Sequence, residues 1–234
     1  WSRGLGDVYK RQDFRLADFE STTTGSTIWA ILNGETSELH LNIPGRHIAD
    51  NAMAVLGAVA ITGANLDRAF EALGSLEAVK GRGQRHHLQI NGGSFLLIDE
   101  SYNANPASMR ASIAVLAETP TQGHGRRVAV LGDMLEMGEF SAQLHEELAG
   151  PLLAAGIEHV WLAGEAMAAL RDALPDSVTV IWFPTTAELT DFALQWVQPG
   201  DALMVKSSLG LGFGKIVAAL LDKYPAFPET ERQV

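Results

Sequence analysis

The chain has 234 residues, of which 47% are hydrophobic and 19% charged, the balance of a globular protein with a real core. Its formal net charge of −11 argues against a nucleic-acid partner, which needs basic side chains gathered on one face. The chain has no cysteine, which excludes disulfides and fits a reducing cytoplasm, and its apolar runs stop well short of the ~20 residues of a membrane span.

The first twelve residues, WSRGLGDVYKRQ, lack an initiating methionine and any periodicity, and they join abruptly to DFRLADFE. They resemble translated vector or adapter sequence, so a non-native leader is predicted at residues 1–12. The rest of the chain is then expected to be the C-terminal portion of a longer protein.

The next part of the chain predicts three strands followed by two helices. Residues 13–43 alternate polar and apolar side chains, with turns expected at Thr24-Gly25 and Asn33-Gly34. The stretch GRHIADNAMAVLGAVAITGA has apolar residues at helical spacing and predicts a helix that ends at Gly63. A second helix is predicted over Leu66–Leu73. The basic loop EAVKGRGQRHHLQI then leads into a strand, and SFLLIDES predicts another.

From Asn105 onward, strands and helices alternate. Asn105 followed by Pro106 predicts a helix start, because proline gives up an amide that has no partner there. Four strand-helix pairs follow: RVAVLGD, HVWLAG, VTVIWF and DALMVKSS, with helices near Ser141–Ala154, Glu165–Ala173, Thr186–Val197 and Gly214–Asp222. This alternation predicts a parallel, doubly wound α/β sheet that binds ligands at the carboxyl ends of its strands. A domain boundary is expected near Ala104–Asn105.

The glycine-rich stretch VKSSLGLGFGK does not fit a phosphate-binding loop. Leu209 stands where such a loop needs glycine, and Ile216 stands where it needs serine or threonine. A flexible strand-to-helix loop that touches substrate or closes a cleft is predicted instead. Within it, Lys206 is a ligand contact or a solvated rim residue. No complete phosphate-binding loop occurs in these 234 residues.

Other polar residues are candidates that local sequence leaves open. Arg82 lies between glycines and could grip a phosphate or carboxylate, or belong to a solvated basic loop. His47 and Asn51 share a helix face, which suits capping or a core edge as well as ligand binding. Asp133 ends a strand where functional residues gather, whereas His145 is expected to be a surface histidine.

Four stretches together resemble one known family: IDESYNANPASM, VAVLGDMLEMGEFSAQLH, GRHIADNAMAVLGAVA and VKGRGQ. Over about residues 13–225 the chain is similar to the Mur ligases, and within them to enzymes that add D-alanyl-D-alanine to UDP-N-acetylmuramoyl-tripeptide. The resemblance implies a cytoplasmic, ATP-dependent ligase of peptidoglycan-precursor synthesis. Such an enzyme activates the peptide carboxylate as an acyl phosphate, which the amine of the dipeptide attacks.

The resemblance also implies a domain organisation and partners. Residues 13–104 would be the end of the central ATP-binding domain, and residues 105–234 the Rossmann-like C-terminal domain. ATP and Mg²⁺ are the expected cofactors, with the phosphate-binding loop and the magnesium ligands in a preceding part. No catalytic residue and no metal ligand is therefore assigned here, and the chain alone is predicted to be inactive. UDP-N-acetylmuramoyl-tripeptide and D-alanyl-D-alanine are the expected partners of a monomer that binds no nucleic acid.

Site residues follow from the same resemblance. It places four residues at ATP: His47, Asn51, Arg82 and Glu100. Relatives often have aspartate where Glu100 stands, the position expected to bind the ribose hydroxyls. The resemblance places five residues at the hinge or the substrate cleft: Tyr102, Asn103, Asn105, Asp133 and Lys206.

Two alternatives to this interpretation are open. One is another Mur-type or folylpolyglutamate-type ligase, which SYNANP together with GDMLEMG argues against. The other is a stand-alone binding domain without catalysis, which would require the first twelve residues to be native.

Overall fold

The computed structural model describes residues 14–22 and 25–227, so the predicted leader and Thr24 lie outside the described residues. The chain forms two compact units that divide between Ala78 and Val79. None of the described helices is both long enough and apolar enough to cross a membrane.

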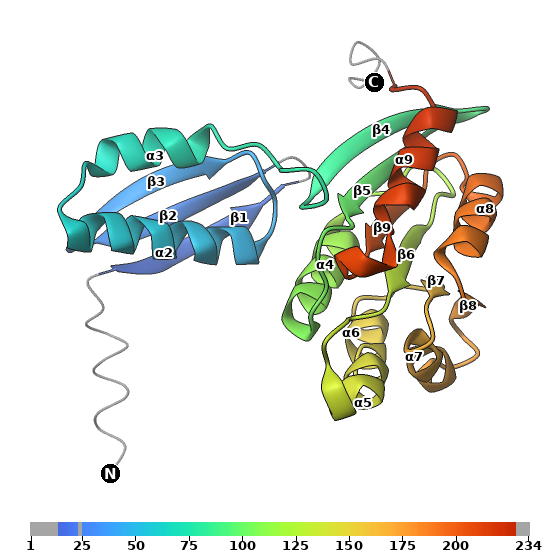
Figure 1. The fold of residues 1–234 in the computed structure, drawn as a ribbon. Helices are drawn as coiled ribbons and strands as arrows, with labels where there is room; N and C mark the ends of the chain where they lie inside the picture. Colours follow the sequence, from blue (N-terminus) through green and yellow to red (C-terminus); the bar gives the residue numbers. More distant parts are fainter. Residues whose placement is uncertain (1–13, 23–24, 228–234) are drawn as a thin grey trace. The chain divides into compact units, whose positions relative to one another are not determined.

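The first unit is a three-stranded antiparallel sheet with two helices (Figure 1). Its elements are β1 (Phe14–Ser21), β2 (Ser26–Leu32), β3 (Glu35–Leu41), α2 (Arg46–Thr62) and α3 (Leu66–Gly74). Ile28, Ala30 and Leu32 on β2 are buried in one core with α2 and α3, as the alternation of side chains predicted. Helix α2 ends at Gly63, whose left-handed backbone (φ 71°) confirms the predicted stop.

The second unit contains a six-stranded sheet in the order β4-β5-β9-β6-β7-β8. Its strands are β4 (Gln84–Ile90), β5 (Gly93–Glu100), β6 (Arg127–Gly132), β7 (His159–Ala163), β8 (Thr179–Phe183) and β9 (Ala202–Lys206). β4 pairs with β5 in antiparallel fashion, and the remaining neighbours are parallel. The predicted α/β fold with a parallel sheet is therefore confirmed.

Helices cover both faces of this sheet (Figure 1). They are α4 (Pro106–Glu118), α5 (Ser141–Glu146), α6 (Ala149–Ala154), α7 (Met167–Ala173), α8 (Thr186–Trp196) and α9 (Gly214–Lys223), with 3-10 turns η1 (Gly138–Phe140) and η2 (Leu209–Leu211). Buried side chains of α4, α6 and α7 form one core with the sheet, and those of α8 and α9 form the other. Two covered faces explain why the central strands are apolar along almost their whole length.

The compact units divide between Ala78 and Val79, because β4 and β5 hydrogen-bond into the same sheet as β9. The domain boundary expected near Ala104–Asn105 stays a prediction. One prediction about the elements is wrong. The helix predicted over Ser141–Ala154 is two short helices, α5 and α6. Pro151 has no amide hydrogen and is accepted only in a first turn, so a new helix begins shortly before it.

Candidate functional site

The predicted site residues of the second unit gather where β5 and β9 end. These strands are parallel neighbours, and their register places Glu100 beside Lys206. Lys206 Nζ lies 3.5 Å from Glu100 Oε2 and donates a hydrogen bond of 3.0 Å to the backbone oxygen of Asn103. Lys206 is 2% exposed. Burial lowers its pKa, Glu100 opposes that change, and the positive charge of Arg82 adds to it.

Asp99 holds the loop that carries Arg82 against the end of β5. Its Oδ2 accepts a hydrogen bond of 3.0 Å from the amide of Gly81, and its Oδ1 accepts one of 2.6 Å from Ser101 Oγ. Gly81 has a φ of +75°, and a Cβ there would lie 2.8 Å from the Cβ of Tyr102. Only glycine suits this position, so the loop is built for close approach to the strand end.

Arg82 and Tyr102 stack at this edge. The Arg82 guanidinium carbon lies 4.3 Å from the centre of the Tyr102 ring, which is cation–π geometry. Beside the pair is a mostly apolar cavity of about 480 Å³. Its lining includes Val79, Lys80, Gly81, Ser101, Tyr102, Leu209, Gly212, Gly214 and Lys215. The edge thus combines one acid, several cations and an aromatic ring next to open space.

Asn105 has a structural part in the site. Its side-chain oxygen accepts from the amide of Ser108 at 2.8 Å, and Ser108 Oγ accepts from the amide of Asn105 at 3.0 Å. This reciprocal capping box, with Pro106 after it, confirms the predicted start of α4.

Asp133 follows β6, and its side chain is turned toward the start of α7. Its Oδ1 accepts a hydrogen bond of 3.0 Å from the amide of Met167. Burial raises the pKa of this carboxyl group, and the backbone amides of Ala166 and Met167 oppose that shift. Position 164 suits only glycine, because a Cβ there would lie 2.3 Å from Oδ1 of Asp133. The backbone oxygen of Asp133 accepts from the amide of Ser208, so this residue does reach the loop that follows Lys206.

His47 and Asn51 lie in the first unit, on α2. Asn51 lines a cavity of about 190 Å³ whose other lining side chains are mostly apolar, among them Ile43, Ile48 and Val55. His47 is not among the lining residues. The structure therefore places Asn51 beside a hollow of the first unit, and the assignment of His47 to ATP stays a prediction.

Arg85 is a functional candidate to which the sequence analysis assigned no role. Within the described residues, its buried Nε has no hydrogen-bond partner. Burial lowers the pKa of Arg85, and Glu100 opposes that change. Arg85 pairs with Ile98 across β4 and β5, so it lies on the same face of the sheet as Glu100. Counting alternate residues along the two predicted strands could have found it.

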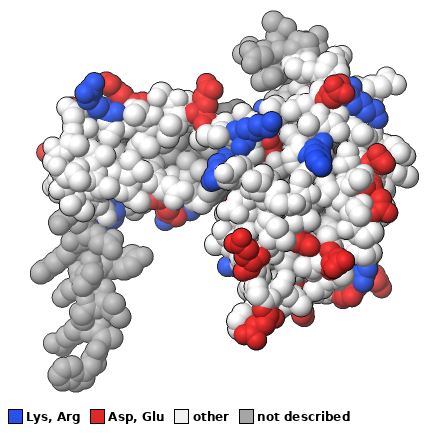
Figure 2. All heavy atoms as spheres, viewed as in Figure 1, with Lys and Arg blue, Asp and Glu red and all other residues white. Residues whose placement is uncertain are grey.

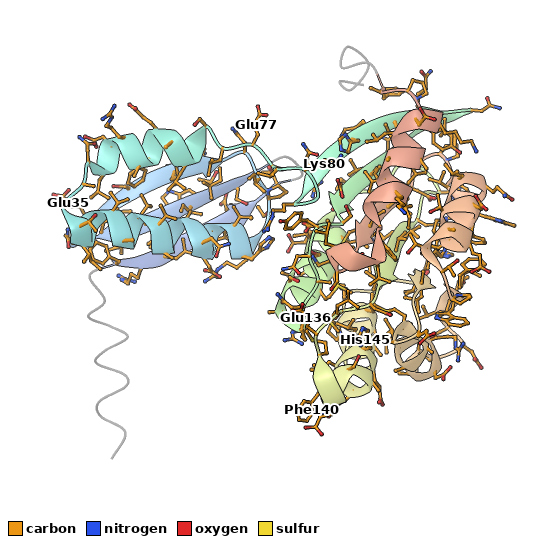
Figure 3. All side chains as sticks on the ribbon, in the orientation of Figure 1. Glu35, Glu77, Lys80, Glu136, Phe140 and His145 are labelled. Atoms are coloured by element: carbon orange, nitrogen blue, oxygen red, sulfur yellow. The ribbon has the colours of Figure 1, made fainter. Side chains whose placement is uncertain are left out.

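The prediction of a surface histidine at 145 is wrong. His145 is fully buried (0% exposed), and its Nε2 accepts a hydrogen bond of 2.9 Å from the amide of Met134. Figure 3 labels it on α5, close to the chain segment that carries Glu136 and Phe140. Leu144 and Leu148 next to it also pack into the core, and this apolar spacing was the available signal.

The charges of the second unit suit an anionic nucleotide only locally. On the face seen in Figure 2, acidic side chains are scattered over the second unit. In residues 14–22 and 25–227, no group of three or more His, Cys, Asp or Glu is placed to hold a metal ion. At the strand edge, Arg82 could pair with a phosphate group, and Glu100 could accept hydrogen bonds from sugar hydroxyls.

The fold and this edge define a doubly wound α/β domain with ligand-binding groups at the carboxyl ends of its strands. The family profile described as "Mur ligase, glutamate ligase domain" matches residues 81–209. The chain belongs to the Mur ligase family.

Named relatives agree with this assignment. The UDP-N-acetylmuramoyl-tripeptide--D-alanyl-D-alanine ligase of Escherichia coli is 34% identical over 211 residues, which are 90% of this chain and 45% of the relative. The ligase of the same name from Rickettsia prowazekii is 29% identical over 186 residues, 80% of this chain and 40% of the relative. The chain thus spans less than half the length of these relatives.

Solved structures show the same fold. A crystal structure of MurF from Acinetobacter baumannii superimposes with a TM-score of 0.77 at 26% identity, over 92% of this chain and 46% of that one. MurF of Thermotoga maritima in complex with ADP has a TM-score of 0.72 at 20% identity, over 94% of this chain and 52% of that one. At such identity the second likeness supports the fold alone.

Proposed function

We propose that this chain is the C-terminal portion of an ATP-dependent ligase that joins D-alanyl-D-alanine to UDP-N-acetylmuramoyl-tripeptide in peptidoglycan-precursor synthesis. One observation carries the proposal: Arg82, Glu100, Tyr102 and Lys206 meet at the carboxyl edge of β5 and β9, inside the region that matches the Mur ligase profile. The names of the Escherichia coli and Rickettsia relatives supply the substrates.

At the nucleotide, the chain's own residues would bind and orient ATP. Glu100 accepts hydrogen bonds from the ribose hydroxyls, while Lys206 holds the Glu100 carboxylate in place. Arg82 pairs with a phosphate group, for which its flat guanidinium is suited. In the first unit, taken by itself, the apolar hollow beside Asn51 suits a flat base, whose edge the amide can recognise. ATP, when bound, supplies the phosphoryl group that activates the peptide carboxylate, and Mg²⁺ is expected to be held by a preceding part of the protein.

At the acceptor side, the same edge would guide the dipeptide. Tyr102 and Asn103 follow the ribose acid after Ser101, and Asn105 fixes the start of α4 behind them. Asp133 directly follows β6 and Lys206 ends β9, and these two strands are neighbours in the sheet. We assign these residues to the cleft where the amine of D-alanyl-D-alanine meets the activated carboxylate of the tripeptide. We further assign the protein to the cytoplasm, as a monomer.

The test is an activity assay on the longer product of the same gene. ADP formation should require both UDP-N-acetylmuramoyl-tripeptide and D-alanyl-D-alanine, and single amino acids should not replace the dipeptide. ADP formation that prefers D-glutamate or a diamino acid would assign the chain to a different ligase of the family. ADP formation that needs neither substrate would contradict the proposal altogether.

A further inference from the structure

The segment after β6 is held in place by hydrogen bonds from outside it. We call residues 133–135 the β6 loop. The backbone oxygen of Asp133 accepts from the amide of Ser208 at 3.2 Å, and the amide of Leu135 donates to Ser208 Oγ at 2.9 Å. Between them, the amide of Met134 donates to His145 Nε2. The backbone of these three consecutive residues is thus fixed by Ser208 on one side and His145 on the other, and the side chain of Asp133 by the amide of Met167.

The histidine can fill this role in one chemical form only. Its Nδ1 lies 2.6 Å from the backbone oxygen of Ser141, and a carbonyl oxygen can only accept, so Nδ1 carries a hydrogen. The amide of Met134 can only donate, so Nε2 must offer a lone pair. His145 is therefore neutral with its hydrogen on Nδ1. A proton on Nε2 would set two donors against each other inside the core.

The residue that follows the β6 loop has an unfavourable backbone conformation, so hydrogen bonds from outside the loop are needed to hold it in place. Glu136, directly after the β6 loop, has a φ of +65°, which a residue other than glycine seldom adopts. Met134 is 1% exposed, so an amide that lost its acceptor there could not turn to water without opening the core.

We propose that His145 is a positioning residue that fixes the β6 loop through its Nδ1–H tautomer, and that Ser208 is the second partner of the same loop. Because the loop carries Asp133, the histidine sets the place of this acid without touching a ligand. That the positioned loop then faces the dipeptide rests on the proposed function. The role of His145 in holding the loop does not.

Hydrogen exchange in the 234-residue chain tests the proposal directly. In H145L, which keeps an apolar side chain but removes the acceptor, the protection factor of the Met134 amide should fall about tenfold, as expected for a lost hydrogen bond. Val130 in β6 should keep its protection. H145Q retains an acceptor oxygen on a side chain of similar reach, and it should restore most of the protection. S208A is the matched control, since it should expose the Leu135 amide and leave Met134 protected.

The tautomer of His145 can also be measured in the unmodified chain, so this second test does not depend on whether H145L folds. Long-range nitrogen–proton NMR of the unmodified chain should show His145 with its hydrogen on Nδ1. A hydrogen on Nε2, or unchanged Met134 protection in a folded H145L, would overturn the proposal.

In the longer ligase, H145L should raise the KM for D-alanyl-D-alanine more than the KM for ATP, and H145Q should reverse the effect. An exchange response without this KM change would uphold the positioning role and contradict the assignment of the loop to the dipeptide.

Discussion

At the scale of single residues, the site depends on a buried ion pair. Lys206 and Glu100 have side chains that are 3% and 16% exposed, so each needs the other to offset the loss of water. The longer acid at position 100 is part of this arrangement, because it reaches the ammonium group from the neighbouring strand. The pair thus ties Glu100, the acid that we assign to the ribose, to the neighbouring strand.

Removing one member of the pair should be costly. In E100Q, the ammonium group of Lys206 stays buried without its carboxylate, and the free energy of unfolding of the second unit should fall by about 3 kcal/mol. Urea unfolding of the purified chain near neutral pH, followed by tryptophan fluorescence, measures this change. The double variant E100Q/K206M removes the stranded charge and should recover most of the loss. Equal stability of E100Q and the unmodified chain would show that the pair contributes nothing.

Asp133 should make stability depend on pH in the opposite direction from most carboxylates. Its pKa is raised, mainly by burial, so the folded state binds the proton more tightly than the unfolded state does. Burying the ionised form of Asp133 lowers the free energy of unfolding. This loss is absent at low pH and grows as the pH rises past the ordinary carboxyl pKa of 3.8. D133N keeps an oxygen for the Met167 amide and cannot ionise. Unfolding free energies measured from about pH 3 to about pH 6 should therefore fall in the unmodified chain relative to D133N. A relative rise would contradict the assignment.

At the scale of elements, the start of α4 is the clearest link between sequence and site. N105A removes the side-chain oxygen that accepts from the amide of Ser108, and should lower the free energy of unfolding by about 1 kcal/mol. N105S can still cap the helix and should lose much less. Thermal unfolding of both variants checks this. An N105A variant as stable as N105S would mean that Pro106 alone sets the helix start.

Sequence reasoning predicted these elements well because their signals are local. The alternation of polar and apolar side chains predicted β1, β2 and β3, and Asn105 followed by Pro106 predicted the first turn of α4. Long-range relations were what local patterns could not predict. That β4 and β5 join the sheet of β9 depends on pairing across about a hundred residues, which no local pattern encodes. His145 was misjudged for the same reason, since its partner Met134 lies across a loop. Glu100 and Lys206 were each singled out, but their contact required the strand register.

At the scale of the whole molecule, the chain carries one edge of a proposed active site and no complete phosphate-binding loop. Phosphoryl transfer depends on groups that bind and neutralise the phosphates, and an edge with Arg82 and Lys206 but without a phosphate-binding loop is not enough for it. We therefore expect the purified 234-residue chain to release no phosphate in response to D-alanyl-D-alanine. A colorimetric phosphate assay with UDP-N-acetylmuramoyl-tripeptide and ATP present would show this. Dipeptide-dependent release above background would contradict it.

The central claim is that this chain is the C-terminal portion of a dipeptide-adding Mur ligase, and the DNA upstream of its first codon tests it most directly. We expect the reading frame into residue 13 to continue upstream and to encode a Gly-x-x-x-x-Gly-Lys-Ser/Thr loop. A start codon immediately before residue 13, with no such loop upstream, would contradict it.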